Sequence, residues 1–445
     1  MAEKIRIKKG LDIPLGGKPS DLVTSDTSSQ IFAIYPDDFP GPLWKTTIKA
    51  GDIVNPGDIL FTDKASGKIC LVSPVAGEIK EVNRGERRHV NFISIDTKGN
   101  SSKNTVGEPL KELNTSEEII EGLQRSGLWA MMRQRPYDIV PDAEAKPRDI
   151  FVTAFDTAPL AGEILATEDK EWLENGLEAL SKLTSGKVYL GIKFGQGLTS
   201  KAAQVYEFEG PHPAGNVGPQ IAAIKPVNKG EVVWALDART VVRIGKLCKG
   251  IADYDTLVAV TGPEVTEPHL VKAIVGASIE GLLKGFIDDA KGKRIISGNV
   301  LTGNKVGIDG YLHYPYRQIT VIPEGDDADE FMGWASMNPG KFSVKRTFPA
   351  FLRGLTKPFD FDARIKGGQR AMILSGEYDK VFPFDIYPEY LLKAIIAKDI
   401  DRMEKLGIYE VSPEDFAMPE FVDTSKNELQ KTVREGLDYL RKELS

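Results

Sequence analysis

The stretch Phe208-Glu-Gly-Pro-His-Pro-Ala-Gly-Asn-Val-Gly-Pro-Gln220 holds three glycines and three prolines in thirteen residues, directly after a strand-like run at 204–208. Proline fixes φ and lacks a donor N–H, whereas glycine tolerates positive φ, so the stretch favours a loop over helix or sheet. In α/β proteins, ligands usually bind in the crevice beyond the end of such a strand. However, neither the G-x-G-x-x-G nor the G-x-x-x-x-G-K-[ST] phosphate fingerprint is present. We therefore favour a rigid structural or interface loop over a ligand site.

Length and composition indicate a multidomain protein of ordinary globular type. The chain has 445 residues, of which 41% are hydrophobic and 27% charged. Its net charge of −7 argues against nucleic-acid binding, which requires a basic face. No apolar run approaches the ~20 residues of a membrane helix, and the cysteines and histidines show no metal-ligand spacing. We expect a cytoplasmic chain with no transmembrane segment and no metal site.

Residues 1–100 are predicted to form an N-terminal strand and a small β domain. Short strand-like runs broken by turns fill residues 43–95. Asp63-Lys64-Ala65 and Ser73-Pro-Val-Ala-Gly77 resemble a biotinyl/lipoyl carrier domain, and this resemblance makes Lys64 the candidate carrier lysine. A second turn at Ser66-Gly-Lys68 lengthens the hairpin, so we favour an unmodified barrel-sandwich scaffold.

Residues 101–255 alternate strands and helices, which predicts a Rossmann-like α/β domain. The capping box Thr115-x-x-Glu118 starts a helix that ends near Ser126. Residues 150–154, 171–183 and 187–193 then follow as strand, helix and strand. This rhythm predicts a parallel sheet with right-handed crossovers.

Residues 256–328 are predicted to form a β-grasp (ubiquitin-like) domain, in which a helix capped by Ser278 packs on a small mixed sheet. Residues 329–445 form a mainly helical C-terminal region. One helix begins at Pro388 and continues to a stop at Gly407. Ser425 is predicted to cap a last helix, whose apolar stripe is Leu429, Val433, Leu437, Leu440 and Leu444. We interpret the tail, residues 383–445, as a docking element for the membrane subunits; the alternative is that its apolar stripes pack against the β-grasp or Rossmann-like domain of this chain.

Short strings spread over nearly the whole chain carry a family resemblance. They are Ile7-Lys-Lys-Gly-Leu-Asp12, Ser126-Gly-Leu-Trp129, Arg135-Pro136, Phe151-Val-Thr-Ala154, Gly210-Pro-His-Pro-Ala-Gly215, Gly276-Ala-Ser278 and Ser297-Gly-Asn-Val-Leu-Thr-Gly303. They resemble the A subunits of sodium-translocating NADH:quinone reductases. This family is related to the C subunit of Rnf complexes and to the flavin- and NADH-binding subunit of respiratory complex I. Each string alone is weak, but together they are specific.

The resemblance implies a place in a respiratory complex that oxidises NADH, reduces quinone and pumps sodium ions out of the cell. The chain would lie on the cytoplasmic side of the bacterial inner membrane, bound to the other subunits. Residues 128–135 replace the glycine-rich loop of the redox relatives, Ala158 replaces a glutamate, and residues 407–445 contain no cysteine. The resemblance therefore implies a subunit that is not catalytic alone and carries no flavin or iron–sulfur cluster; these groups are expected on its partners.

Two predicted loops offer aromatic faces and hydrogen-bond donors to a quinone head group. The candidate contacts are Trp129, Arg133, Arg135, Tyr137, Phe208 and His212. Tryptophan and arginine also anchor protein interfaces, and a histidine between prolines commonly locks a loop, so a structural role is the alternative. The segment 127–136 is expected to be exposed, and the aromatic run 311–317 is interpreted as strand packing. No nucleophile–base pair is visible, so no catalytic residue is assigned.

Two other classes of function fit parts of the sequence. One is a free-standing enzyme component, of an acyltransferase or a carboxylase, that uses Lys64 as a carrier. The other is a small-ligand sensor built on the β-grasp domain. The position of the gene beside those for other pump subunits would discriminate these alternatives from the respiratory role.

Overall fold

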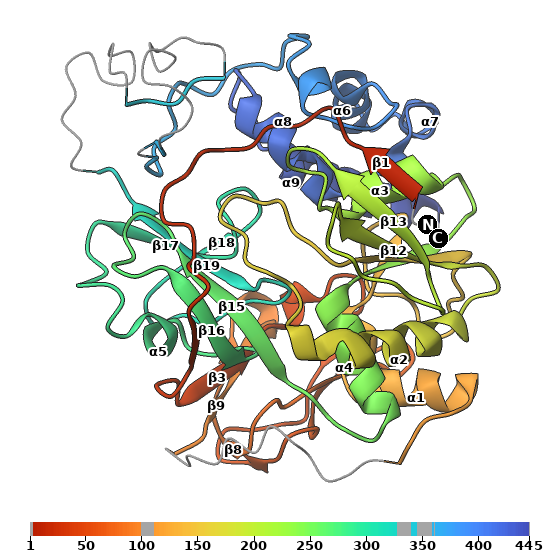
Figure 1. The fold of residues 1–445 in the computed structure, drawn as a ribbon, viewed down its shortest axis with the longest axis vertical. Helices are drawn as coiled ribbons and strands as arrows, with labels where there is room; N and C mark the ends of the chain where they lie inside the picture. Colours follow the sequence, from red (N-terminus) through yellow and green to blue (C-terminus); the bar gives the residue numbers. More distant parts are fainter. Residues whose placement is uncertain (1–2, 99–110, 327–339, 345–357, 360, 445) are drawn as a thin grey trace.

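The computed structural model describes residues 3–98, 111–326, 340–344, 358–359 and 361–444 (Figure 1). A six-stranded sheet forms the centre of the α/β unit, and all its neighbouring strands are parallel except β10 and β14. The predicted parallel sheet is thus confirmed. The strand order is β1 (Glu3–Arg6), β13 (Gln204–Glu209), β12 (Val188–Lys193), β11 (Asp149–Thr153), β14 (Val233–Asp237) and β10 (Arg133–Arg135).

Helices cover both faces of this sheet, as the alternation of side chains along β11 shows. Ile150 and Val152 belong to the core cluster that contains residues of α2 (Lys170–Ser181) and α4 (Ala238–Cys248). Phe151 points the other way, into the cluster that contains Ile221 of α3 (Val217–Ile224). Because successive strand residues face opposite sides, each face has its own helical cover.

The predicted capping box at the start of the α/β unit is confirmed. In front of α1 (Ser116–Arg125), the Thr115 hydroxyl accepts from the Glu118 N–H at 3.2 Å, and the Glu118 carboxylate accepts from the Thr115 N–H at 3.2 Å. Two otherwise unpaired donors of the first turn are satisfied in this way.

A second six-stranded sheet, of mixed direction, lies beside the α/β unit. Ser278 caps its short helix α5 (Ile279–Leu283), as predicted, by accepting from the Gly281 N–H at 3.3 Å. The sheet has the order β18 (Asn304–Val306), β17 (Lys293–Ser297), β19 (Gln318–Pro323), β15 (Asp255–Thr261), β16 (His269–Ile274) and β2 (Val23–Ser25). The Rossmann-like and β-grasp assignments, and the domain boundaries, stay predictions.

Two small antiparallel sheets make up the N-terminal β unit at the bottom of Figure 1. One has the order β3 (Ile31–Ile34), β9 (Val90–Asp96), β8 (Gly77–Arg84) and β5 (Ile53–Val54), and the other β4 (Trp44–Lys45), β6 (Ile59–Asp63) and β7 (Cys70–Val72). The strands before residue 31 do not join either sheet: β1 pairs with β13 and β2 pairs with β16. The first residues of the chain therefore connect the two larger sheets.

The C-terminal helices differ from the prediction in two places. Pro388 begins a helix as predicted, but the helix breaks near Lys398, whose φ is 54°, and forms α6 (Pro388–Ile396) and α7 (Ile400–Lys405). The last helix, α9 (Leu429–Leu444), starts four residues after Ser425, whose hydroxyl donates instead to the Ala371 carbonyl at 3.0 Å. Ser425 is therefore not the predicted cap.

The apolar stripe of α9 is covered by this chain itself. Leu429, Val433, Leu437 and Leu440 are fully buried in a cluster that includes Phe416, next to α8 (Ala417–Val422), whereas Leu444 is exposed. Ile13, from the N-terminal segment, belongs to the same cluster. The stripe is therefore buried inside this chain, as the alternative interpretation has it, and docking of the tail to membrane subunits stays a prediction.

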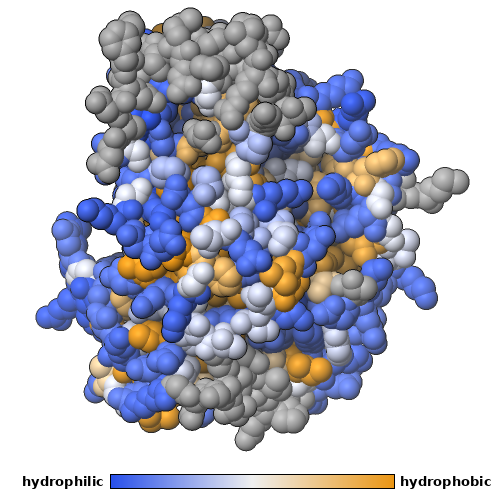
Figure 2. Space-filling model, turned by 60° about the vertical axis from the view of Figure 1, so that its left-hand side comes forward, coloured by the Kyte–Doolittle hydropathy of each residue, from blue (hydrophilic) through white to orange (hydrophobic). Residues whose placement is uncertain are grey.

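No helix in the described ranges combines the length and the apolar character needed to cross a membrane. Figure 2 shows that on one face the hydrophobic residues are interspersed with hydrophilic ones. Single exposed hydrophobic side chains of this kind are normal on protein surfaces.

Candidate functional site

The units of the chain meet at a cleft of about 520 Å³. It lies beyond the C-terminal ends of β11 and β14 and at the start of α3, where parallel α/β sheets usually bind ligands. The N-terminal unit, the second sheet and the C-terminal tail complete its walls. Its polar lining includes Asp38, Arg133, Arg135, Asp138, Thr153, Asp156, Asn216, Asp237, Tyr316, Arg317, Glu414 and Arg434.

Asp38 joins three units at one edge of the cleft. It ends the short turn η1 (Pro36–Asp38), and its Oδ1 lies 2.8 Å from Nδ1 of His313 while its Oδ2 accepts from the Tyr314 N–H at 2.9 Å. The Tyr314 hydroxyl in turn donates to the Met131 carbonyl at 2.7 Å. Burial raises the pKa of Asp38, and the bond from His313 opposes that rise. These bonds therefore fix the positions of the cleft walls relative to one another.

Arg133 lies in the same wall. Its Nη2 donates to the Asp38 carbonyl at 2.8 Å, and its guanidinium stands 5.4 Å from the centre of the Tyr314 ring. The side chain is half-buried and borders the cleft. It thus combines a fixed position with an accessible positive charge, as a ligand contact requires.

Arg135 anchors the tail at the other side of the cleft. The side chain is almost fully buried, with Nη1 3.2 Å from Oδ2 of Asp415 and Nε 3.5 Å from Oδ1 of Asp138. The same Asp415 carboxylate accepts from the N–H and the hydroxyl of Ser412, both at 2.8 Å, in a capping box. A buried ion pair of this kind links β10 to the tail.

Glu414, beside this pair, is expected to make stability depend on pH. It lines the inner wall of the cleft, where loss of hydration between the walls and then the Asp415 carboxylate raise its pKa from 4.5 to about 8. Between these two values the folded chain holds a proton that the unfolded chain has lost, so the free energy of unfolding falls as pH rises through this window. Glu414→Gln should remove that part of the slope in denaturant titrations at a series of pH values. An unchanged slope would show that Glu414 titrates normally.

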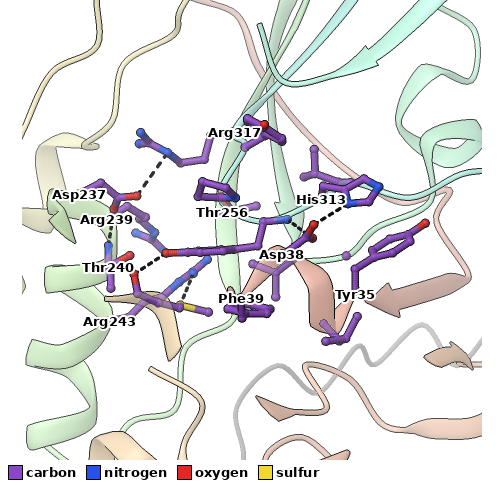
Figure 3. Close-up of a pocket in the computed structure, with 18 of the residues that line it drawn as sticks. Tyr35, Asp38, Phe39, Asp237, Arg239, Thr240, Arg243, Thr256, His313 and Arg317 are labelled. Carbon is purple, nitrogen blue, oxygen red and sulfur yellow. Dashed lines mark hydrogen bonds and ion pairs between the residues drawn. The ribbon is translucent and has the colours of Figure 1, made fainter. Parts of the chain in front are cut away.

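A smaller cavity of about 50 Å³ adjoins the cleft at the start of α4 (Figure 3). Asp237 is the N-cap of α4, and its Oδ1 accepts from the Thr240 N–H at 2.7 Å. Arg239, Arg243 and Arg317 also border the cavity. In the figure, side chains from α4 face those of Asp38, Tyr35 and His313 across it.

The structure separates the residues predicted to contact quinone. Arg133 and Arg135 border the cleft, but Trp129 is fully buried, with its Nε1 donating to the Pro141 carbonyl at 2.9 Å and its ring 5.1 Å from that of Trp234. The prediction that segment 127–136 is exposed is therefore wrong, because all its residues are buried or half-buried and the indole of Trp129 fills the core. Phe208 is fully buried in a different cluster. Quinone contact itself stays a prediction.

The remaining candidates lie away from the cleft lining. Tyr137, at a φ of 81°, packs half-buried against the tail cluster. His212 is buried; its N–H donates to Asp12 at 3.0 Å and its Nδ1 lies 3.2 Å from the Thr157 hydroxyl. Burial lowers the pKa of His212 to about 4, although Asp156 and Asp12 oppose the change. These contacts support a structural role for the first part of the loop 208–220, whereas Gly215, Asn216 and Val217 line the cleft.

Lys64 is exposed in the turn between β6 and β7. The Asp63 carboxylate organises this turn by accepting from the Ser66 and Ile69 N–H groups at 2.7 and 3.1 Å. Such a self-capped turn is a stable scaffold element. The absence of a modification on Lys64 stays a prediction.

Sequence reasoning missed several residues that form the cleft. The run 311–317, interpreted as strand packing, contains no strand; it forms a wall of the cleft and places Tyr314, Tyr316 and Arg317 there. The signal available was Pro315 in the middle of the run, since proline is disfavoured inside a central strand. The signal for Glu414 was the capping pattern Ser412-x-x-Asp415, which fixes the helical turn that contains Glu414.

Among the described residues, no group of acidic, histidine or cysteine side chains is arranged to hold a metal ion.

Three family descriptions match consecutive parts of the chain. Residues 5–98 match the NqrA N-terminal barrel-sandwich hybrid domain, residues 114–250 the NqrA second alpha/beta domain, and residues 257–307 the NQRA C-terminal domain. The predicted barrel-sandwich domain at the N-terminus is thereby confirmed.

Relatives of similar length match over the whole chain. The A subunit of the Na(+)-translocating NADH-quinone reductase of Pasteurella multocida is 35% identical and that of Hahella chejuensis 37% identical, each over 99% of this chain and 100% of the relative. That of Histophilus somni is 36% identical over the same shares. A chain of an NAD+-reducing [NiFe]-hydrogenase in the H2-reduced state superposes with a TM-score of 0.38 at 11% identity, covering 73% of this chain and 61% of that one; this likeness is too loose to bear on fold or function.

Proposed function

Because the chain belongs to the family of A subunits of Na(+)-translocating NADH-quinone reductases, we propose that it is the peripheral, cytoplasmic-side subunit of such a complex. In this role it binds the other subunits, including those in the membrane. The complex passes electrons from NADH to quinone and moves sodium ions out of the cell. The full-length match to these relatives is the observation that carries the proposal.

We propose further that this chain holds no flavin and no iron–sulfur cluster. A flavin phosphate needs backbone N–H groups that a glycine-rich loop leaves accessible. In this chain the corresponding segment carries Leu128, Trp129 and Met132, all of them buried. The side chains occupy space that a flavin would need, so the residues present do not fit that cofactor.

The cleft supports a role in quinone access. Arg133 and Arg135 border it, and Phe155 and Tyr316 add aromatic surface. A quinone head group offers two carbonyl acceptors and a flat ring, which arginine and aromatic side chains bind well. Arg133 is the better contact, because the charge of Arg135 is already paired with Asp415 and Asp138.

Reconstitution of the complex with and without this chain tests the proposal. Without the chain we expect NADH:quinone activity and sodium uptake by inverted vesicles to be lost. With the chain present, Arg133→Met should raise KM for quinone several-fold and leave KM for NADH unchanged. The exposed Arg402, on α7, offers the control Arg402→Met. Full activity without the chain would contradict the subunit role, and an unchanged KM for quinone in Arg133→Met would contradict quinone access alone.

A further inference from the structure

The cavity at the start of α4 is small, and several charged side chains border it. Its volume of about 50 Å³ exceeds the ~10–15 Å³ that one water needs, so it has room for a group of a few heavy atoms but not for a fused ring system. It shares Asp237, Tyr314 and Arg317 with the lining of the cleft, from which a small solute can enter.

Arg243, on the wall of this cavity, is a buried cation without a carboxylate partner. The residue is 4% exposed, and in the described ranges it forms no ion pair. Its Nη2 donates to the Asp255 carbonyl at 2.7 Å, its Nη1 has only the Met131 sulfur at 3.6 Å, and its Nε has no partner. Buried guanidinium groups are normally paired, because removing the charge from water is costly. The Nε–H of Arg243 is therefore a buried donor that lacks a hydrogen-bond acceptor.

The neighbouring Arg239 is a second buried cation, and it offers Arg243 no hydrogen-bond acceptor. It lies one turn earlier on α4, and its own charge is paired with Asp169 at 3.2 Å and Asp253 at 2.9 Å. Burial and repulsion from Arg239 lower the pKa of Arg243, and attraction to Asp253 and Asp237 only partly opposes the change. A negative group in the cavity would remove this electrostatic strain.

Arg317 and Asp237 are the two other charged side chains at the cavity that have hydrogen-bonding capacity to spare. Among the described residues the Arg317 side chain makes no hydrogen bond, and its Nε lies 4.0 Å from Oδ2 of Asp237 (Figure 3). Asp237 caps α4 through Oδ1, which leaves Oδ2 able to accept a further hydrogen bond. The other acid at the cavity, Asp38, is already bonded to His313 and to the Tyr314 N–H.

We propose that this cavity binds a small oxyanion that carries a proton, of the class of hydrogen phosphate. Its oxygens accept from Nε of Arg243 and from the Arg317 guanidinium, while its O–H donates to Oδ2 of Asp237. The eleven-residue helix α4 adds the favourable end of its dipole. Sulfate has the same shape but no proton near neutral pH, so it would place an unprotonated oxygen against the Asp237 carboxylate. The site should therefore prefer phosphate to sulfate. This binding does not depend on the proposed quinone role.

Thermal unfolding of the full chain in phosphate-free buffer near neutral pH tests the proposal. Inorganic phosphate should raise Tm by about 2 °C for each tenfold increase above Kd. Sulfate at matched ionic strength should need at least a tenfold higher concentration for the same shift. Asp237→Asn retains a good N-cap but offers the anion an N–H donor in place of a carboxylate oxygen. The difference between the phosphate and sulfate concentrations needed for the same shift should therefore become smaller or reverse. Equal shifts with phosphate and sulfate in the wild type would indicate a general salt effect and overturn the proposal.

Two variants separate binding from folding. Arg243→Met should abolish the phosphate shift without lowering Tm in phosphate-free buffer, because an unpaired buried charge is replaced by an apolar chain of similar length. Arg402→Met, on the surface of α7, should retain the full shift. A full phosphate shift in Arg243→Met would overturn the site.

A phosphate monoester distinguishes the sources of the anion. Near neutral pH the ester is largely the dianion and lacks the O–H that Asp237 accepts, so it should bind more weakly than inorganic phosphate. Tighter binding of the monoester than of inorganic phosphate would overturn the proposal of a free oxyanion. It would indicate that the cavity binds the phosphate group of a larger molecule that lies in the cleft.

Discussion

Replacing Asp415 by alanine is expected to lower the free energy of unfolding by about 3–5 kcal/mol, the usual effect of removing one member of a buried ion pair. Arg135 would keep only the more distant Asp138, at 3.5 Å, and would remain almost fully buried. The same change removes the acceptor of the Ser412 N–H and hydroxyl, which opens the capping box at the start of the turn η9 (Pro413–Phe416). Denaturant titration followed by circular dichroism measures the loss.

A double variant separates the charge from the cap. Asp415→Ala together with Arg135→Met removes the buried positive charge but does not restore an acceptor for the Ser412 N–H. Because replacing both members of a buried pair is often close to neutral, this chain should recover most of the lost stability. If Asp415→Ala unfolds at the wild-type denaturant concentration, the pair does not hold the tail to β10. If the double variant is as unstable as Asp415→Ala, the cap rather than the charge is responsible.

Local patterns in the sequence predicted the elements that depend on local physics. The Thr115 capping box and the Ser278 cap lie where side-chain spacing placed them, because an N-cap bond joins residues three apart. The buried run 150–154 is a central strand of the parallel sheet. Ser425 failed as a cap because its hydroxyl bonds to Ala371, 54 positions away in the sequence, and no local pattern contains that partner.

The cleft could be predicted only in part, since its residues come from distant segments. Arg133 and Arg135 were identified through their segment, but the partners that define their roles, Asp38 and Asp415, lie 95 and 280 positions away. Trp129 stands in the same segment and was expected on the surface with them. Its burial depends on Trp234, a neighbour that only the folded sheet supplies. Composition of a short segment does not determine which of its side chains face a core.

Gly245→Ala is expected to lower the free energy of unfolding by about 3 kcal/mol, near the upper end of the usual cost of overpacking. At this point α4 crosses α2 so closely that a Cβ on Gly245 would lie 2.0 Å from the Trp172 carbonyl oxygen and 2.8 Å from the Gly176 nitrogen. Alanine favours helix by ~1 kcal/mol over glycine, which offsets part of the cost but not the clash. Because the contacts are with backbone, the helices must move apart to relieve it.

Gly368→Ala is the matched control, since a Cβ there meets nothing within 4 Å and its unfolding free energy should stay within about 0.5 kcal/mol of wild type. Displacement of α4 also moves Asp237, at its N-cap, and Arg243, on its second turn, away from Arg317. Gly245→Ala should therefore reduce the phosphate-dependent rise in Tm as well as Tm itself, whereas Gly368→Ala should change neither. A Gly245→Ala chain with wild-type stability would show that α2 and α4 can separate without cost. A destabilised chain with an unchanged phosphate shift would show that the start of α4 is held in place by Asp38 and the loop 311–317 rather than by α2.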